Sequence, residues 1–367
     1  MKLRYKITGG FLVLAIVALV VLALALSHNA ACGPAPVIPG NAKLMNAIIY
    51  RCYGSADVLE MENIEIPAPA DNEVLVKVQA AAVNPLDWHY MRGSPYIMRF
   101  GSGFGAPEEI RLGVDFAGTV QAVGRNVTQF KPGDEVFGGR TGAFAEYVAV
   151  PDDRAMVLKP ANITFEQAAS VPIAAITALQ ALRDKGQIKP GQKVLINGAS
   201  GGVGTFAVQI AKSFGAEVTG VCSTRNVGMV KSIGADHVID YTQQDYTENG
   251  QQYDLIVDMV GNHSLSENRQ VLNPEGIFVI VGGSRGNWLG PLMSPIKALM
   301  YSPFVEQEFV MLLAKMRKED LTILGDLMET GKITPVIDRR YPLNEVPAAI
   351  RYSEEGHARG KIIINME

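Results

Sequence analysis

The 367-residue sequence has only three cysteines, Cys32, Cys52 and Cys222, and no two of them stand at a paired spacing. We therefore predict neither a disulfide framework nor a zinc knuckle, and we expect reduced thiols. The chain also lacks a basic stripe, since 33 Lys and Arg are spread along it among 37 Asp and Glu. A nucleic-acid partner is therefore not expected.

Residues 193–212 combine the pattern of a strand with that of a helix, and glycines are plentiful between the two. Residues 194–196 form a short apolar run typical of a buried strand, and from 203 to 214 apolar residues recur at helical spacing. Between them stand Gly198, Ser200, Gly201, Gly202 and Gly204, with Val203 opening the helix. Glycine suits a strand-to-helix turn that a diphosphate approaches closely, and a second apolar strand at 218–221 completes a dinucleotide-binding unit.

The residues after that second strand select the nucleotide. An acid there would hydrogen-bond the ribose 2′-OH of NAD, but residues 222–226 read CSTRN and contain none. Ser223, Arg225 and Asn226 instead favour the 2′-phosphate of NADP(H). The alternative is a solvated loop with an incidental arginine.

The N-terminus carries an apolar run over residues 11–26, preceded by Lys2, Arg4 and Lys6. With residues 7–10 the run reaches the roughly 20 residues that a bilayer core requires, so we predict one transmembrane helix as a membrane anchor within residues 1–28. A cleaved signal peptide is the alternative, because basic residues, an apolar core and small residues such as Ala30 and Ala31 are also its features. Residues 29–44, rich in Pro and Gly, are expected to form a stiff tether.

The orientation of this anchor is in conflict with the predicted cofactor. Positive residues before the run and almost none after it would place the rest of the chain outside the cytosol. Reduced nicotinamide cofactors are inside the cell. Either the charge rule is overridden, or the segment lies in one leaflet, or the domain works outside the cytosol; we expect a cytosol-facing domain.

The remaining chain has a part rich in predicted strands and a part in which predicted strands and helices alternate. Short β-branched runs bounded by turn residues predict strands at 47–50, 59–66, 73–82, 114–123, 135–137 and 145–150. From 164 on, helical and apolar segments alternate, with a helix at 165–182 and strands at 194–197, 218–222, 238–240, 255–259 and 277–281. We further predict helices at 297–316 and 321–330, a strand at 333–336, and a last strand at 361–365 that rejoins the first domain.

Several motifs occur in a fixed order from residue 81 to the end: AAVNPLD at 81–87, GVDFAG at 113–118, KPGDEV at 131–136, GAFAEY at 142–147, VP at 171–172 with TA at 177–178, the turn at 198–204, GADHVIDY at 234–241, and GK at 360–361. Together they resemble the zinc-independent quinone oxidoreductase branch of the medium-chain dehydrogenase/reductase superfamily. The glycine turn is similar to that of membrane-associated mitochondrial and chloroplast quinone reductases.

The resemblance implies an α/β fold with a GroES-like β-rich catalytic domain and a doubly wound Rossmann domain. The catalytic domain would take residues 45–163 and 333–367, and the Rossmann NADP-binding domain residues 164–332. Family members are often dimers, so a homodimer is possible.

The resemblance also assigns a cleft. Zinc members have a Cys near the position of Asn84 and a Gly-His-Glu run where this chain has GVD at 113–115, so no metal is predicted. Asn84 and Asp87 would line the cleft, and Tyr90 or His89 could protonate the product. Asp87 capping a turn, Tyr90 packing in the core and His89 as a structural imidazole are the alternatives.

Cofactor contacts are implied residue by residue. Thr177 would lie near the carboxamide, the glycine turn would hold the diphosphate, and Lys361 would pair with the cofactor, an ordinary surface lysine being the alternative. Tyr241 would join Ser223, Arg225 and Asn226 at the 2′-phosphate. The remaining contacts lie at the carboxyl ends of strands: Val260, Gly261, Val281, Gly282 and Gly283.

These observations predict an NADPH-dependent oxidoreductase that transfers hydride without metal to a quinone or α,β-unsaturated carbonyl. Its partner would be a small lipophilic substrate, met at the membrane. A 2-enoyl thioester reductase is one alternative. A catalytically silent, membrane-tethered binding protein is another, from a different functional class.

Overall fold

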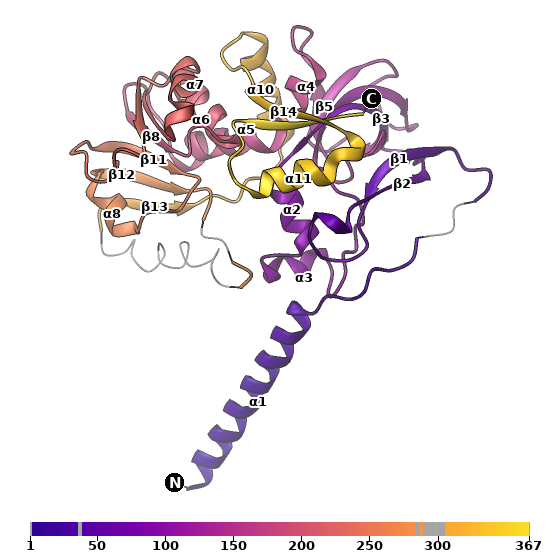
Figure 1. The fold of residues 1–367 in the computed structure, drawn as a ribbon, viewed down its shortest axis with the longest axis horizontal. Coiled ribbons are helices and arrows are strands. Elements are labelled where there is room, and N and C mark those ends of the chain that lie inside the picture. The colour runs from indigo at the N-terminus through magenta and orange to yellow at the C-terminus, as the bar shows by residue number, and fades with distance from the viewer. Residues whose placement is uncertain (1, 36–38, 284–285, 289–297, 299–304, 367) are drawn as a thin grey trace.

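A computed structural model describes residues 2–35, 39–283, 286–288, 298 and 305–366, with the side chains of residues 2–14 left out. Within these residues the strands form two large sheets and a hairpin, and one helix projects from the body at the N-terminus (Figure 1). The hairpin is β1 (Leu44–Ile49) paired with β2 (Glu60–Glu65). The fold is the predicted α/β combination of a β-rich unit and a doubly wound unit.

The six-stranded sheet is parallel throughout. Its strand order is β10 (His237–Asp240), β9 (Glu217–Cys222), β8 (Lys193–Asn197), β11 (Tyr253–Asp258), β12 (Leu272–Ile280) and β13 (Glu308–Met311). Helices α6 (Gly202–Ser213), α7 (Val227–Ser232) and α8 (Leu265–Gln270) contact its strands, whereas α5 (Pro172–Gln180) and α10 (Lys318–Glu329) contact each other and strands of the second large sheet. Val194, Leu195 and Ile196 are fully buried, as expected for a central parallel strand covered on both faces.

The seven-stranded sheet combines both ends of the chain. Its order is β14 (Ile337–Pro342), β15 (Lys361–Asn365), β3 (Glu73–Val83), β4 (Asp115–Val123), β5 (Glu135–Gly139) and β7 (Met156–Leu158), with β6 (Tyr147–Pro151) paired to β3. β15 lies antiparallel to β3, with Ile363 opposite Ala82, so the last strand rejoins the first domain as predicted. The helices beside this sheet are α2 (Pro85–Arg92), α3 (Arg99–Ser102), α4 (Phe165–Ala169) and α11 (Val346–Glu354).

Three predicted elements are wrong. Residues 308–311 of the predicted helix 297–316 form the edge strand β13, and 289–297 and 299–304 lie outside the described residues. The strand predicted at 333–336 begins at Ile337 instead. The helix predicted at 165–182 is interrupted, because Pro172 lacks an N–H and starts the new helix α5 at its first position.

The N-terminal helix α1 (Lys2–Ser27) projects away from both sheets (Figure 1). From residue 15 on, where its side chains are described, Ile16, Val17, Leu19 and Leu24 are more than half exposed. A search of the described residues finds no helix with both the length and the apolar character needed to cross a bilayer. The predicted transmembrane anchor is therefore not supported.

The segment after α1 is fastened to the body rather than free. Cys32 and Cys52 form a disulfide, which corrects our expectation of reduced thiols, because the fold brings together two cysteines whose sequence spacing indicated no pair. Disulfides are typical of oxidising compartments, which counts against the expected cytosol-facing domain. Arg99, only 1% exposed, also donates hydrogen bonds to the carbonyl oxygens of Leu26 and His28, each at 2.8 Å.

Candidate active site

The glycine turn has the space that a bound diphosphate needs. Gly198 has φ +91°, and α6 begins at Gly202 with its first N–H groups facing the turn. A Cβ on Gly204 would lie 2.1 Å from the Gly198 carbonyl oxygen, so this glycine permits close packing of helix and strand. A Cβ on Gly201 would meet only one atom within 4 Å, at 3.5 Å, so this side of the turn is open. The turn therefore fits the phosphates of a dinucleotide.

The predicted 2′-phosphate residues gather where β9 ends. Ser223 follows the strand directly, and Arg225 is exposed with its Nη2 donating to the carbonyl oxygen of His357 at 2.8 Å. Tyr241 is 57% exposed, and its backbone N–H is held by Cys222 O at 3.0 Å. Burial raises the pKa of the Cys222 thiol to about 11, so this cysteine is an unreactive part of the core.

Asp258, at the end of β11, holds two further predicted cofactor loops. Asp258 Oδ1 accepts hydrogen bonds from the backbone N–H groups of Val260 and Gly261 at 2.9 and 3.0 Å. Its backbone oxygen accepts from Val281 N and Gly282 N at 2.9 and 3.1 Å. The loops at 260–261 and 281–283 are thus fixed side by side at the carboxyl edge of the parallel sheet, where such sheets bind ligands.

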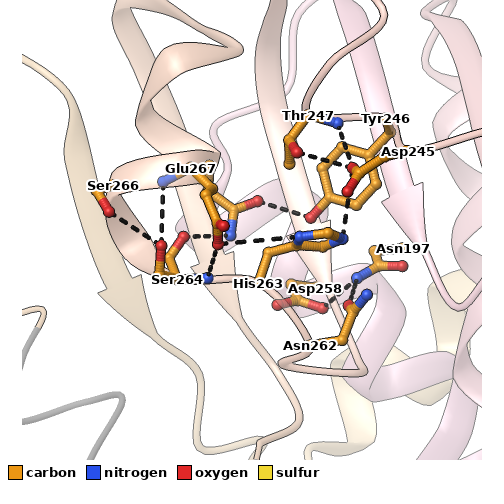
Figure 2. Close-up of polar contacts among 11 residues, drawn as sticks. Asn197, Asp245, Tyr246, Thr247, Asp258, Asn262, His263, Ser264, Ser266 and Glu267 are labelled. Carbon is orange, nitrogen blue, oxygen red and sulfur yellow. Dashed lines mark hydrogen bonds and ion pairs between the residues drawn. The ribbon is translucent and has the colours of Figure 1, made fainter.

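Figure 2 shows that this carboxylate belongs to a larger polar cluster. Asn197 Nδ2 donates to Asp258 Oδ1 at 2.9 Å and to Asn262 Oδ1 at 2.8 Å, which joins the end of β8 to the loop after β11. The adjacent His263 lies between two carboxylates, 3.7 Å from Asp245 and 4.0 Å from Glu267. Burial raises the pKa of Asp258. Sequence reasoning missed this support because its members come from three separate segments.

A second polar network, fully buried, lies where β3, β4 and β15 meet. Lys361 Nζ donates to Asn84 Oδ1 at 2.6 Å and is 3.6 Å from Asp115 Oδ2. Asn84 Nδ2 donates to the same Asp115 oxygen at 3.0 Å. Asp115 Oδ1 accepts from the Ile173 N–H at 3.0 Å, which attaches the first turn of α5 to the network.

This network touches the glycine turn. Gly360 N donates to Ser200 O at 2.9 Å, and the Lys361 stem passes 3.3 Å from the place a Cβ on Gly202 would occupy. The cofactor cradle and the buried polar network are therefore neighbours across the β15 chain. Burial lowers the pKa of Lys361 and raises that of Asp115, while each charge opposes the shift of the other.

Asp87 lies on helix α2 beside this network and is fully buried. Its Oδ2 accepts from the Asn84 N–H at 2.7 Å, so it caps the helix, whereas its Oδ1 has no hydrogen-bond partner. Burial raises the pKa of Asp87 to about 7, and the charge of Asp115 adds to the shift. Near neutral pH this carboxyl group can therefore hold or release a proton.

The other predicted cleft residues have simpler surroundings. Tyr90 is half-buried on α2 and packs against the core of the seven-stranded sheet. His89 Nδ1 lies 2.6 Å from Ser94 O, and burial lowers the pKa of its imidazole, as expected for a structural histidine. Thr177 is buried on α5, and its hydroxyl donates to Ile173 O at 2.7 Å.

Of the predicted site residues, Asn84, Asp87 and Lys361 therefore share one buried polar network, which Gly360 joins to the glycine turn. Asp115 was missed as a site residue, although the sequence carried its signal in the acid of the GVD motif. Among the residues that the structure describes, no three His, Cys, Asp or Glu side chains are grouped to hold a metal ion.

Comparisons with known proteins match the chain to two family models. The model described as alcohol dehydrogenase GroES-like domain matches residues 70–161, and the model described as zinc-binding dehydrogenase matches residues 233–364. A chloroplast envelope quinone oxidoreductase homolog of Arabidopsis thaliana is 35% identical over 347 residues, covering 88% of this chain and 98% of that protein. A mitochondrial NAD(P)H oxidoreductase of Mus musculus is 33% identical, covering 88% and 89%.

Solved structures agree with these matches. The quinone oxidoreductase from Coxiella burnetii superposes with a TM-score of 0.78 at 30% identity, covering 89% of this chain and all of the other. The Escherichia coli quinone oxidoreductase complexed with NADPH superposes with a TM-score of 0.74 at 25% identity, covering 87% and 99%. The likeness therefore spans both sheets.

Proposed function

The chain belongs to the medium-chain dehydrogenase/reductase superfamily, among its quinone oxidoreductase-like members, and we propose that it is an NADPH-dependent reductase of quinones and α,β-unsaturated carbonyls. The observation that carries the proposal is the contact of the open glycine turn with the buried network, through Gly360 and Lys361. A dinucleotide on that turn is placed beside groups able to bind a polar acceptor and to supply a proton.

Reduction proceeds without a zinc ion. One matched family model is described as a zinc-binding dehydrogenase, but the donor set here does not fit zinc. Asn84 offers a neutral amide, and its oxygen already accepts from the Lys361 ammonium group, which also stands 3.6 Å from Asp115. The amide oxygen that Asn84 could offer a metal is thus already engaged by a cation of the protein.

The bound nicotinamide supplies hydride to the acceptor when the cofactor is reduced. Hydride addition to a quinone or enone leaves an oxyanion that must be stabilised and then protonated. The network of Lys361 and Asn84 provides a buried positive charge and amide dipole for this purpose. Asp87 Oδ1, which is unpartnered, is the group that we propose to hold the proton for this oxyanion, and Tyr90, half-buried on the same helix, stays the alternative donor.

NADPH is the preferred reductant. Support comes from the residues at the end of β9, where Ser223 and the exposed Arg225 stand and where no acid occupies residues 222–226. The guanidinium of Arg225 is held by His357 O, so it is already placed near the strand end. A charged guanidinium and a hydroxyl are typical ligands of a phosphate monoester.

The test follows the oxidation of NADPH and NADH by the purified full chain with a short-chain ubiquinone, a simple quinone and an alkenal offered in parallel. We expect NADPH oxidation well above NADH oxidation with at least one acceptor. Arg225→Asp should lower kcat/KM for NADPH far more than for NADH, whereas Arg154→Asp, an exposed arginine in a distant loop, should change neither. Failure to bind either nucleotide would refute the proposal.

We also propose that helix α1 attaches the protein to lipid. The described residues 16–24 expose Ile16, Val17, Leu19, Val21 and Leu24 by more than half, and a helix that is apolar on all sides is unstable in water. Flotation of the full chain with phospholipid vesicles tests this, with Leu19→Glu as the variant expected to sediment. A homodimer remains a prediction, to be measured by light scattering.

A further inference from the structure

One buried amide joins the two loops that we assign to the phosphates of the cofactor. Asn226 is only 4% exposed, and its Nδ2 donates to Ser200 Oγ at 3.1 Å and to Ser223 Oγ at 3.2 Å. Ser200 belongs to the glycine turn, and Ser223 follows strand β9. Both serines are half-buried, so each hydroxyl can still meet a ligand.

The direction of these hydrogen bonds decides what the serines can do. A hydroxyl has one proton to donate and two lone pairs that accept. Because the amide N–H groups fill one lone pair on each oxygen, both hydroxyl protons are free to point elsewhere. Two oxygens that share one nitrogen partner are close enough for a single phosphate group to accept from both.

The other half of the amide gives a second, independent observation. Asn226 Oδ1 is buried and has no hydrogen-bond partner. An unpartnered buried acceptor is costly unless a ligand donates to it. A ribose that carries a phosphate offers both complements at once, because its free hydroxyl can donate and its phosphate can only accept.

We propose that Asn226 is a positioning residue for cofactor choice: it turns the hydroxyl protons of Ser200 and Ser223 outward to donate to the 2′-phosphate of NADPH. The proposal rests on the proposed NADPH-dependent function. It differs from the role of Arg225, which supplies charge, because Asn226 acts by fixing which groups of its neighbours donate.

The variant Asn226→Asp tests this with almost no change of volume. A carboxylate accepts from both serines, so their protons turn inward, and its negative charge faces the incoming phosphate. We expect kcat/KM for NADPH to fall by about 100-fold, the size expected for two lost hydrogen bonds to a charged group. The value for NADH, which has no 2′-phosphate, should change less than about threefold by the same reasoning.

Two further variants separate this role from a structural one. Asn226→Ala removes the donors without adding charge, so it should lower kcat/KM for NADPH by about tenfold. Asn268→Asp makes the same chemical change at a buried asparagine on helix α8, where Asn268 Oδ1 accepts from the Tyr246 hydroxyl. This control should leave the NADPH to NADH ratio unchanged.

The outcomes are distinguishable. Equal losses for both cofactors in Asn226→Asp would mean a merely structural role, and an unchanged NADPH value would mean that the serines are not set by the amide; either result overturns the proposal. A wild-type enzyme that reduces acceptors with no preference between NADPH and NADH would overturn the proposed cofactor choice itself, before any variant is made.

Discussion

The buried carboxyl group of Asp87 makes a prediction about pH that can be worked out in sign and size. Its pKa is raised from 3.8 to about 7, chiefly because burial penalises the charged form. A raised pKa means that the folded state holds the proton more tightly than the unfolded state. The free energy of unfolding should therefore fall as the pH rises from about 4 through about 7, and stay level above that.

The size follows from the shift. About three pKa units at 1.36 kcal/mol each give a ceiling of roughly 4 kcal/mol between the two ends of that range. Asp87→Asn keeps the shape and the capping oxygen but carries no charge at any pH. The variant should thus resemble the wild type only below about pH 4, gain on it steadily through about pH 5 to 7, and be more stable than it at pH 8 by about 2–4 kcal/mol.

The assay is the urea midpoint of the full chain at a series of pH values between about 5 and 8, for wild type and variant in parallel. Asp153→Asn, whose side chain is 80% exposed, is the matched control and should show no pH-dependent difference. A difference between Asp87→Asn and wild type that stays constant over this range would show that Asp87 is already ionised, and would remove it as the proton store.

Other predictions concern packing, charge and the N-terminal segment. Gly204→Ala should lower the melting temperature, because its Cβ would lie 2.1 Å from a backbone oxygen. Gly202→Ala, whose Cβ would have no atom nearer than 3.3 Å, should keep the melting temperature and weaken NADPH binding. Equal melting temperatures for the two variants would contradict this. Lys361→Met leaves the buried Asp115 unpaired and should cost about 3–5 kcal/mol in urea unfolding, and a neutral effect would refute the buried ion pair. Arg99→Met removes the hydrogen bonds to the carbonyl oxygens of Leu26 and His28, so proteases should cut residues 26–29 faster than in the wild type. An unchanged digestion rate would show that these hydrogen bonds do not hold the segment.

The sequence predicted most of what depends on local pattern. Strand β8, the glycine turn and α6 were predicted to within a residue or two. The continuous apolar run predicted the buried strand, the helical spacing of apolar residues predicted the helix, and the glycines between them predicted the turn. The return of the last strand to the first domain, seen as β15 beside β3, was predicted from the β-strand pattern that reappears near the C-terminus. Edge strand β13 was mistaken for helix, since a short apolar run carries no period of its own.

The supporting contacts of the site could not be predicted. Asp115, Asn84 and Lys361 are far apart in sequence and meet only because β4, β3 and β15 pair in one sheet. The same holds for Asn197 and Asp258, which lie at the ends of neighbouring parallel strands. Sequence pattern marks which residues are polar within an apolar segment, but strand order decides which of them face each other.

The bond between Cys32 and Cys52 closes residues 33–51 into a ring. Lys43 is exposed within that ring, so trypsin can cut the backbone there without separating the two pieces. On a non-reducing gel the nicked chain would run as one species, and on a reducing gel the N-terminal helix would leave as a small fragment. The ring thus keeps helix α1 on the enzyme after cleavage, for as long as its surroundings remain oxidising.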